Sequence, residues 1–536
     1  MKTRTLLAML LALSACLPLA RNARAETTDV ILDSLQYGAF RYFWDEANPA
    51  NGLIKDRSQS GAVCSIASTG FGLSAICIGA DHGWVTRATA RTRVLTTLQT
   101  FWNGPQGSAA SGTIGFLGLY YHWLDMNTAT RTWDSELSTI DTALLFAGIL
   151  DARQYFDDVD AGEVQIRALA DSIVRRANWF VMRNFSAGIY MGWKPGSGFN
   201  GFGKWVGYNE AMILYLLAIG APVPSRAAPA SDWSFWTASY NWSTQYGYSY
   251  VNFPPLFGHQ YSHCWIDFRG LKDAYMSQPA HDIDYFENSR RATLAQQAYC
   301  VANPGGFVGY SDTLWGITAS DCPTGYCARG APPAQGDNGT IAPTAVAGSL
   351  PFAPEICVPT LRSLYQTYKP GPLWSPYGFR DAFNLTSNPD WYGADVLGID
   401  QGPIIIMIEN YRTGRVWQRF MRGLEIQQGL DRAGFIRTVV AVGDAPGVRP
   451  QAELMPAAPN PFSASTTLRY RLHEAARVRL SVFDVSGREV ARLIDADQTA
   501  GDHDADFRAG GIPSGIYYCR LQAGAASTGR WIARMR

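Results

Sequence analysis

Residues 142–150 read TALLFAGIL and residues 211–219 read AMILYLLAI, and these two stretches decide the fold class. Neither carries a charge or alternates with period two, so each predicts a helix that is buried on all sides. Twelve segments of helical period are predicted, with almost no alternating strands among them: 30–45, 70–80, 87–102, 138–156, 163–184, 206–219, 258–276, 285–302, 353–368, 401–411, 414–421 and 424–433. Twelve helices joined by long loops fit six inner and six outer helices, which is an all-α (α/α)6 barrel, or toroid.

The chain changes character near residue 440. Residues 443–451, GDAPGVRPQ, have the composition of a linker. Beyond them, hydrophobic residues alternate with period two at 468–472, 478–485, 489–494 and 514–521, with a turn at 485–488. Short strands at this spacing predict a small β-sandwich. We therefore expect a helical domain over residues 27–440, a linker over 441–455 and an Ig-like β-sandwich over 456–536.

The first 25 residues have the pattern of an export signal. A basic start precedes an apolar stretch at 6–19, and Ala23-Arg24-Ala25 offers a small-x-small cleavage site. A competing interpretation is a lipoprotein box at 13–16, which would leave Cys16 lipidated at the mature N-terminus. Both interpretations predict export, to the outer cell surface, the extracellular space or the periplasm. No later apolar run reaches the roughly 18 residues of a transmembrane helix.

Composition narrows the class of ligand. The 536 residues contain 45 Lys plus Arg and 45 Asp plus Glu, so the formal net charge is zero. A balanced chain lacks the basic surface of a nucleic-acid binder, and we exclude that class. The 17 Trp, 26 Tyr and 25 Phe residues suit a neutral, flat-faced ligand such as a sugar, although filling the core is the ordinary role of aromatic side chains.

Export permits disulfides, and eight cysteines follow the signal region. Cys322 and Cys327 lie close together in a Pro/Gly loop, which favours a local bridge, whereas the other six have apolar neighbours and are expected to be free buried thiols. His259 and His263 are four residues apart, but no Glu lies between them as in a zinc-protease helix. We expect neither a metal nor a cofactor.

Polar residues stand just before the apolar runs. Glu136 and Asp141 precede one run, Asn209 and Glu210 the next, and Asp400 opens another. If the inner helices run in parallel, these N-terminal ends meet at one rim and surround a cavity. Any single Asp, Glu or Asn at such a position is more simply a helix cap. Successive helices that each open with a different polar residue exceed what capping requires.

Several long segments resemble the bacterial glucoamylase-like family of glycoside hydrolases, which includes endo-β-1,2-glucanases. The resemblance covers about residues 35–435 and is carried by GAFRYFWDEANPANGLIKDRS (38–58), GFGLSAICIGADHGW (70–84), ELSTIDTALLFAGIL (136–150), GYNEAMILYLLAIG (207–220), PPLFGHQYSHCWIDFRG (254–270), YFENSRRATLAQQAYC (285–300), DNGTIAPTAVAGSLPFAPE (337–355) and LGIDQGPIIIMIENYRTG (397–414). It implies an (α/α)6 barrel and glycoside hydrolysis with inversion. The same segments are similar to the transglycosylase part of cyclic β-1,2-glucan synthases, so transfer is an alternative.

Glycoside hydrolysis needs one protonated and one ionised carboxyl group. We expect Glu210 to be the acid, because its aromatic and apolar sequence neighbours would raise its pKa by desolvation. Asp141 is expected to be the base or a subsite carboxylate, with Glu136 in reserve. Arg380 and Asp381 either serve the site or join two loops. The expected substrate-binding residues are Asp56, Arg57, Trp193, Trp205, Asn209, His259, Gln260, His263, Trp265 and Asp400.

The C-terminal segments PNPFSASTTLRYRL (459–472), VFDVSGREVARL (482–493), AGDHDADF (500–507) and SGIYYCRL (514–521) resemble the sorting and FlgD-like Ig domains of bacterial surface proteins. The resemblance implies recognition by a secretion machinery, although the chain lacks the lysine-rich end of many sorting domains. We therefore expect an exported, monomeric, inverting endo-β-1,2-glucanase acting on a polysaccharide or oligosaccharide. The alternatives are a β-1,2-glucan transglycosylase, an exo-acting glucoamylase and a non-catalytic glycan-binding protein.

Overall fold

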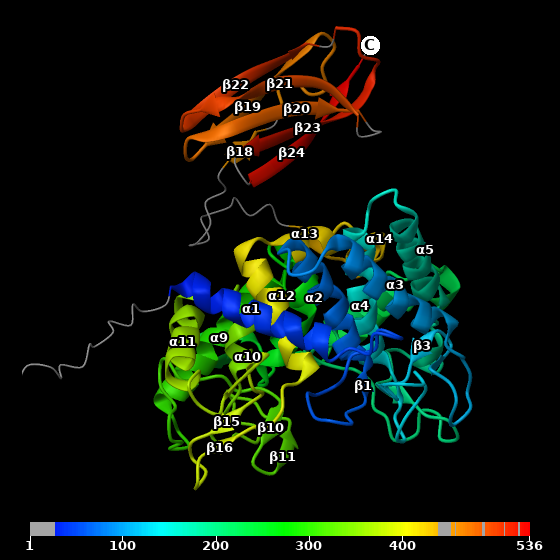
Figure 1. Ribbon diagram of the computed structural model, residues 1–536, viewed down its shortest axis with the longest axis vertical. Coiled ribbons are helices and arrows are strands. Elements are labelled where there is room, and N and C mark those ends of the chain that lie inside the picture. Colours follow the sequence, from blue (N-terminus) through cyan, green and yellow to red (C-terminus); the bar gives the residue numbers. More distant parts are fainter. Residues whose placement is uncertain are drawn as a thin grey trace, which may run out of the picture. The chain divides into compact units, whose positions relative to one another are not determined.

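The chain divides into two units, Met1–Thr438 and Val439–Arg536, in a computed structural model (Figure 1). The structure describes residues 27–437, 452–455, 457–484, 488–508, 510–523 and 526–535. The predicted signal at 1–25, the linker stretch 443–451 and most of the turn at 485–488 lie outside the described residues. Within the described part, no helix combines the length and the apolar character that crossing a membrane requires.

Helices α1 to α12 of the first unit alternate between an outer and an inner position. Among the inner helices, α2 packs on α4, α4 on α6, α6 on α8, and both α8 and α10 on α12, which closes the ring on α2. The inner helices are α2 (Ile66–Asp81), α4 (Thr139–Tyr155), α6 (Met212–Ile219), α8 (Tyr261–Trp265), α10 (Pro343–Ala347) and α12 (Gly398–Arg412). The outer helices are α1 (Thr28–Asp45), α3 (Arg87–Asn103), α5 (Ala161–Arg176), α7 (Ser231–Thr237), α9 (Tyr285–Ala302) and α11 (Pro354–Tyr368). The described helical unit is therefore the expected toroid.

Burial explains the sequence of the inner helices. All eight residues of α6 are buried, as are most residues of α2 and α4, so the ring removes a large and mostly apolar surface from water. Two glycines let α2 and α4 approach closely. A Cβ at Gly70 would lie 2.3 Å from the Leu144 carbonyl oxygen, and a Cβ at Gly148 would lie 1.9 Å from that of Gly70. Larger residues there would push the two helices apart.

The twelve predicted helices are not the same twelve that form the ring. The sequence pattern misses α7 and α10, which are too short to show a period, and counts α13 (Arg415–Phe420) and α14 (Leu424–Arg432), which follow the ring. The segment predicted at 206–219 begins only at Met212, and the one at 163–184 ends at Arg176 before a single turn, η1 (Val181–Arg183). The segment predicted at 258–276 is wrong over its second half, because η3 (Leu256–His259) and α8 are followed by a strand.

Short antiparallel ladders, which the sequence pattern does not reveal, shape the loops of the helical unit. β1 (Cys64–Ser65) pairs with β4 (Trp123–Leu124), and β5 (Leu137–Ser138) pairs with β6 (Gly192–Trp193), directly before α2 and α4 respectively. The remaining strands of this unit are β2 (Gly115–Phe116), β3 (Leu119–Tyr120), β7 (Trp242–Gln245), β8 (Tyr248–Val251), β9 (Leu271–Lys272), β10 (Ser320–Cys322), β11 (Gly325–Cys327), β12 (Thr340–Ile341), β13 (Trp374–Ser375), β14 (Gly378–Phe379), β15 (Phe383–Asn384), β16 (Trp391–Tyr392) and β17 (Ile436–Arg437). Two-residue pairs are too short to produce a visible alternation.

The second unit is built from two antiparallel sheets. One has the order β18 (Ala452–Leu454), β19 (Ser465–Leu472) and β22 (Gly501–Arg508). The other has the order β21 (Glu489–Gln498), β20 (Ala476–Phe483), β23 (Gly515–Ala523) and β24 (Ala526–Arg534). Alternate residues such as Leu468, Leu480 and Leu521 join one hydrophobic cluster between the sheets. The predicted linker at 441–455 is wrong over its last residues, because β18 belongs to the first sheet.

The cysteines follow the sequence prediction. Cys322 and Cys327 form a disulfide within the hairpin of β10 and β11. The other cysteines of the described residues are free and buried: Cys64, Cys77, Cys264, Cys300, Cys357 and Cys519. Burial raises the thiol pKa of these six, which keeps them unreactive.

Candidate active site

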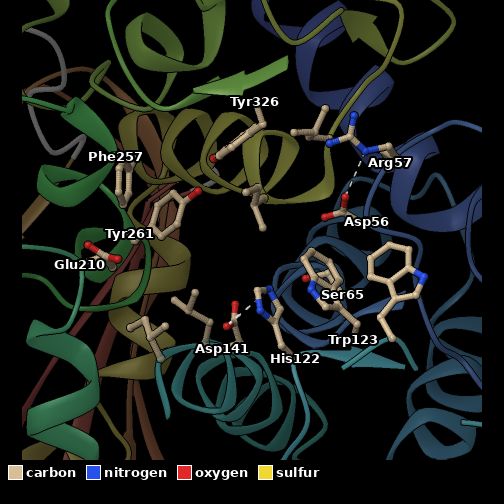
Figure 2. Close-up of a pocket in the computed structure, with 15 residues that line it drawn as sticks. Asp56, Arg57, Ser65, His122, Trp123, Asp141, Glu210, Phe257, Tyr261 and Tyr326 are labelled. Carbon is tan, nitrogen blue, oxygen red and sulfur yellow. Dashed lines mark hydrogen bonds and ion pairs between the residues drawn. The ribbon is translucent and has the colours of Figure 1, made fainter. Parts of the chain in front are cut away.

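A cavity of about 470 Å³ lies at the N-terminal ends of the inner helices (Figure 2). Ser65 caps α2, Asp141 lies in the first turn of α4, Glu210 precedes α6, Tyr261 opens α8 and Ile399 lies in the first turn of α12. The inner helices thus run in parallel and bring these ends to one rim. The rest of the lining is Asp56, Arg57, His122, Trp123, Trp133, Ile140, Leu144, Phe257, Tyr326 and Leu397.

Glu210 enters the cavity beside Phe257 and Tyr261 (Figure 2). Its backbone is fixed, because its carbonyl accepts a hydrogen bond from Ser262 Oγ at 3.1 Å. Burial raises the pKa of the Glu210 carboxyl to about 7, and the negative charge of Asp141 adds to this rise. A large fraction of Glu210 is therefore protonated at neutral pH, which is what a proton donor requires.

His122 joins two carboxylates. Its Nδ1 lies 2.8 Å from Glu136 Oε1 and its Nε2 lies 3.6 Å from Asp141 Oδ2. Burial alone would lower the pKa of His122, but the charges of Asp141 and Glu136 outweigh it and raise the pKa to about 9. Burial likewise opposes ionisation of Glu136, yet its bond to His122 lowers its pKa. His122 is therefore an imidazolium at neutral pH and lies between the carboxyl groups of Glu136 and Asp141.

Donor atoms of His122, Glu136 and Asp141 lie within 4.8 Å of one another, a spacing that a cation can occupy. The ring, however, uses one nitrogen for Glu136 and the other for Asp141. One imidazole nitrogen can bind one ion, so a metal could not keep both contacts. The arrangement suits a protonated histidine better than a metal centre.

Arg57 and the tryptophans shape the side of the cavity away from Glu210 (Figure 2). The Arg57 guanidinium lies 3.3 Å from Asp56, 3.3 Å from Asp321 and 3.2 Å from Asp395. Burial raises the pKa of Asp56, and Arg57 opposes that rise. Trp123 stacks on His122, with centroids 3.8 Å apart, and packs edge-on against Trp133 at 5.7 Å. Trp133 is 68% exposed, so its face is open to a ligand.

Asp400 lies buried behind the lining rather than in it, next to Asp381. Among the described residues, Asp400 Oδ2 and Asp381 Oδ1 lack any other hydrogen-bond partner. Burial raises the pKa of both groups, that of Asp381 to about 6 and that of Asp400 well above its usual value. The hydrogen bond between the two carboxyl groups lowers the pKa of Asp381 and raises that of Asp400. One proton held between the two oxygens satisfies both. Burial and then the charge of Asp400 also raise the pKa of Tyr261 and of Tyr326.

Four residues expected to bind substrate are buried in the α8 region and do not line the cavity, so the structure contradicts these predictions. His259 contacts the Phe253 carbonyl at 3.2 Å, and burial lowers its pKa to about 3. Gln260 donates to the Ala345 carbonyl and to Ser349, both at 2.8 Å, and so joins α8 to α10. His263 lies 3.1 Å from Ser289 Oγ, and burial lowers its pKa well below the ordinary value.

The fourth of these residues, Trp265, stacks on Phe71 and donates to Ser74. Three others expected at the site are also absent from the lining of the cavity. Trp193 packs on Phe116, and Trp205 donates its indole N–H to Thr139 Oγ1 at 3.0 Å. Asn209 accepts a bond from the Ala211 N–H, which closes a local turn in front of α6 and is not a side-chain cap of that helix.

Arg380 joins two loops, because it donates to the carbonyl oxygens of Pro372 and Ala394. The sequence is compatible both with this role and with a role in the site. Its neighbour Asp381 faces Asp400, as described above. Of the expected residues, the cavity therefore brings together Glu210, Asp141, Asp56 and Arg57, with Glu136 one hydrogen bond away.

Sequence reasoning missed every lining residue other than Asp56, Arg57, Asp141 and Glu210, including all of those that carry a ring: His122, Trp123, Trp133, Phe257, Tyr261 and Tyr326. The pair His122-Trp123 carried a usable signal, because it follows Tyr120-Tyr121 in a chain with only seven histidines. Tyr261 and Phe257 lie in the segment 254–270, in which His259 and His263 are the more usual candidates for a binding role. No local sequence signal marks Trp133, which reaches the cavity from a loop, or Tyr326, which reaches it from the short strand β11.

Comparison with known proteins gives consistent matches over the helical unit. A family model described as "Putative glucoamylase" matches residues 203–423. The exo beta-1,2-glucooligosaccharide sophorohydrolase (non-reducing end) of Parabacteroides distasonis is 32% identical over 443 residues, which cover 77% of this chain and 58% of that protein. The chain thus spans less than two thirds of the length of that curated relative.

Two solved structures match at nearly their full length. A putative glucoamylase from Bacteroides uniformis is 36% identical with a TM-score of 0.70, covering 77% of this chain and 98% of that one. An endo-beta-1,2-glucanase from Chitinophaga pinensis, in complex with sophorotriose and glucose, is 30% identical with a TM-score of 0.69, covering 77% of this chain and 99% of that one.

Proposed function

Because the chain belongs to the glucoamylase-like family of glycoside hydrolases, we propose that its helical unit cleaves β-1,2-linked glucan in the cavity described above. The names of the similar proteins support the substrate class, since two of the three refer to β-1,2-linked glucose. A single observation carries the proposal. One cavity contains a carboxyl whose pKa is raised by burial to about 7, Glu210, and a second carboxyl paired with a histidine, Asp141.

The chemistry follows from these two states. Glu210 donates its proton to the glycosidic oxygen, so the leaving sugar departs as an alcohol. Asp141 accepts a proton from a water molecule, whose oxygen attacks the anomeric carbon from the opposite face. The carbon–oxygen bond to the leaving group breaks as the new one forms, and the product has the inverted configuration. His122 holds Asp141 in place between Ser138 and its own ring.

The rest of the lining suits a neutral sugar. Trp123, Trp133, Phe257, Tyr261 and Tyr326 supply aromatic faces, and Arg57 with Asp56 supplies hydrogen-bond donors and acceptors for hydroxyl groups. A second hollow of about 280 Å³ shares Asp56, Arg57 and Trp133 with the cavity and continues along residues 59–63. The second hollow gives a bound glucan room beyond the reacting groups. This supports an endo mode, in which the glucan extends past both ends of the site.

The test is product analysis with linear β-1,2-glucan and, separately, soluble starch. We expect short β-1,2-linked oligosaccharides of mixed length from the first and none from the second. Release of disaccharide alone would establish an exo mode. Cleavage of starch alone would overturn the substrate, and elongated or cyclic glucans would establish transfer. Proton NMR of the first products, before mutarotation, reports the inversion.

For the second unit we propose a role in sorting during secretion, with export directed by residues 1–25 and the mature protein a monomer. The resemblance of residues 459–521 to sorting domains supports this role, and the separate hydrophobic core of the unit supports an independent module. Fusion of residues 439–536 to an exported reporter tests it. Surface or extracellular accumulation of the fusion is expected, and retention in the periplasm would overturn it.

A further inference from the structure

The hairpin of β10 and β11 contributes Tyr326 to the cavity. In Figure 2 the Tyr326 hydroxyl points across the cavity toward that of Tyr261. Tyr326 is 50% exposed as a whole residue, and its hairpin neighbour Gly325 is exposed as well, although the Tyr326 side chain lines the cavity. Its direct cross-strand partner is Asp321. The position of Tyr326 therefore depends on what holds Asp321.

Asp321 is held from two sides. Its carboxylate lies 3.3 Å from Arg57, whose guanidinium also lies 3.2 Å from Asp395. Its backbone N–H donates to Asp381 Oδ2 at 2.5 Å, and Asp381 in turn faces Asp400 in the first turn of α12. The hairpin is thus fixed both to the loop before α2 and to the ring itself.

The base of the hairpin has a third support. The buried guanidinium of Arg329 donates to Ser320 Oγ, to the Asp321 carbonyl and, at 3.0 Å, to Asn338 Oδ1. A buried charge with several hydrogen bonds is costly to displace, because leaving it unpaired costs several kcal/mol. The strand that carries Asp321 is therefore rigid.

The other end of the hairpin is closed by the Cys322–Cys327 disulfide, which spans Pro323, Thr324, Gly325 and Tyr326. The bridge limits the conformations of this loop, and Tyr326 is adjacent to one of the bridged residues. The polar anchor at Asp321 and the covalent closure together leave the Tyr326 side chain little freedom to leave the cavity.

We propose that this disulfide-closed hairpin is a preformed wall of the glucan site, in which Tyr326 contacts a glucosyl unit and the disulfide is a positioning element for Tyr326. The inference rests on the function proposed above and adds a determinant of affinity. A contact side chain fixed before binding loses little conformational entropy when the ligand arrives. Loosening the hairpin should weaken binding of the glucan and leave the chemical step, which depends on Glu210 and Asp141, nearly unchanged.

The experiment measures KM and kcat on linear β-1,2-glucan for the full chain. We expect Tyr326→Ala to raise KM about tenfold with kcat changed less than about twofold, and Tyr326→Phe to raise KM about threefold. The paired substitution Cys322→Ser with Cys327→Ser is expected to raise KM about threefold to fivefold. The matched control is Tyr246→Ala, since Tyr246 is a 42% exposed hairpin tyrosine outside the cavity. Its KM should equal that of the wild type.

A double-mutant cycle separates positioning from general loosening. If the disulfide acts through Tyr326, the cysteine pair should add no further increase in KM in the Tyr326→Ala background. Unchanged KM in Tyr326→Ala, or fully additive effects in the cycle, would overturn the proposal. Thermal unfolding identifies any variant that is misfolded. If Tyr326→Ala is misfolded, the KM of Tyr326→Phe tests the contact between Tyr326 and the glucan. An inactive wild type would overturn the proposed function itself, whereas an active wild type with these null results would overturn the hairpin role alone.

Discussion

The mouths of α4 and α8 both carry polar residues, but the environments of these residues are opposite. Both begin with polar residues in front of apolar ones, yet Asp141 of α4 faces the cavity, whereas His259, Gln260 and His263 around α8 are fully buried. At α4, Ser138 caps the helix by accepting a bond from the Asp141 N–H, and its hydroxyl donates to Asp141 Oδ2, so the Asp141 carboxylate is not needed as a cap and faces the cavity. At α8, the polar side chains already have partners inside the protein. His259 contacts the Phe253 carbonyl, Gln260 donates to the Ala345 carbonyl, and His263 contacts Ser289 Oγ.

A polar side chain at a helix mouth is thus available for catalysis only when other groups cap the helix and hold it to its neighbours. The comparison predicts that substitutions at the α4 mouth remove activity and preserve the fold, whereas substitutions at the α8 mouth do the reverse. The following predictions test that separation, beginning with the largest effect.

Asp141→Asn should lower kcat on β-1,2-glucan about 10³-fold, because an amide cannot accept the proton of the attacking water. The matched variant at the other mouth, His259→Gln, should retain kcat within about threefold of the wild type. Steady-state kinetics on purified proteins provide the measurement. Equal losses in both variants would remove the distinction between the two mouths.

The activity should fall as the pH rises through about 7, the pKa of Glu210, because the acid must be protonated to donate. The expected decline in kcat/KM approaches tenfold per pH unit above that value. His122, with a pKa of about 9, stays charged over this range and does not set the limit. A profile that is flat between pH 6 and about 9 would contradict the assignment of Glu210.

His263→Asn should destabilise the protein by about 1–3 kcal/mol. The shorter side chain leaves the buried Ser289 hydroxyl without its hydrogen-bond partner and leaves part of the space of the imidazole ring unfilled. The kcat at 25 °C should stay within about threefold of the wild type. Chemical denaturation and kinetics on the same sample give both quantities. A large loss of kcat with unchanged stability would place His263 in the active site after all.

Glu210→Gln should change stability in a pH-dependent way. The pKa of Glu210 is about 7 in the folded protein and 4.5 in the unfolded chain, so the wild type loses stability as the pH rises from 4.5 through 7. The uncharged glutamine removes this loss. The melting temperature of the variant should exceed that of the wild type by about 1–3 °C at pH 8, and the two should converge near pH 4. The opposite sign would show that the folded protein favours the carboxylate.

The sequence predicts the ring because two of its inner helices contain uncharged apolar runs, 142–150 and 211–219, that are buried on every face. It does not reveal α10, whose five residues make little more than one turn, nor α7, whose aromatic and polar residues show no period. Position in a closed ring, rather than local propensity, makes these short segments helical.

The sequence also predicts Glu210 and Asp141, since a carboxylate directly before an apolar run is a local signal. His122 could not be found this way. Its partners lie 14 and 19 residues further along the chain, and the contact depends on the pairing of Ser65 with Trp123 in the β1–β4 ladder. Trp265 shows the opposite error, because an aromatic residue in a quoted motif proved to be core.

The proposed mechanism depends most on Glu210 as the proton donor to the glycosidic oxygen. The direct measurement compares Glu210→Gln with the wild type on two substrates, linear β-1,2-glucan and an aryl β-sophoroside with a dinitrophenolate leaving group, which departs without protonation. We predict a loss of about 10³-fold on the glucan and less than about tenfold on the aryl glycoside. Equal losses on both substrates would contradict the acid role of Glu210 and with it the proposed mechanism.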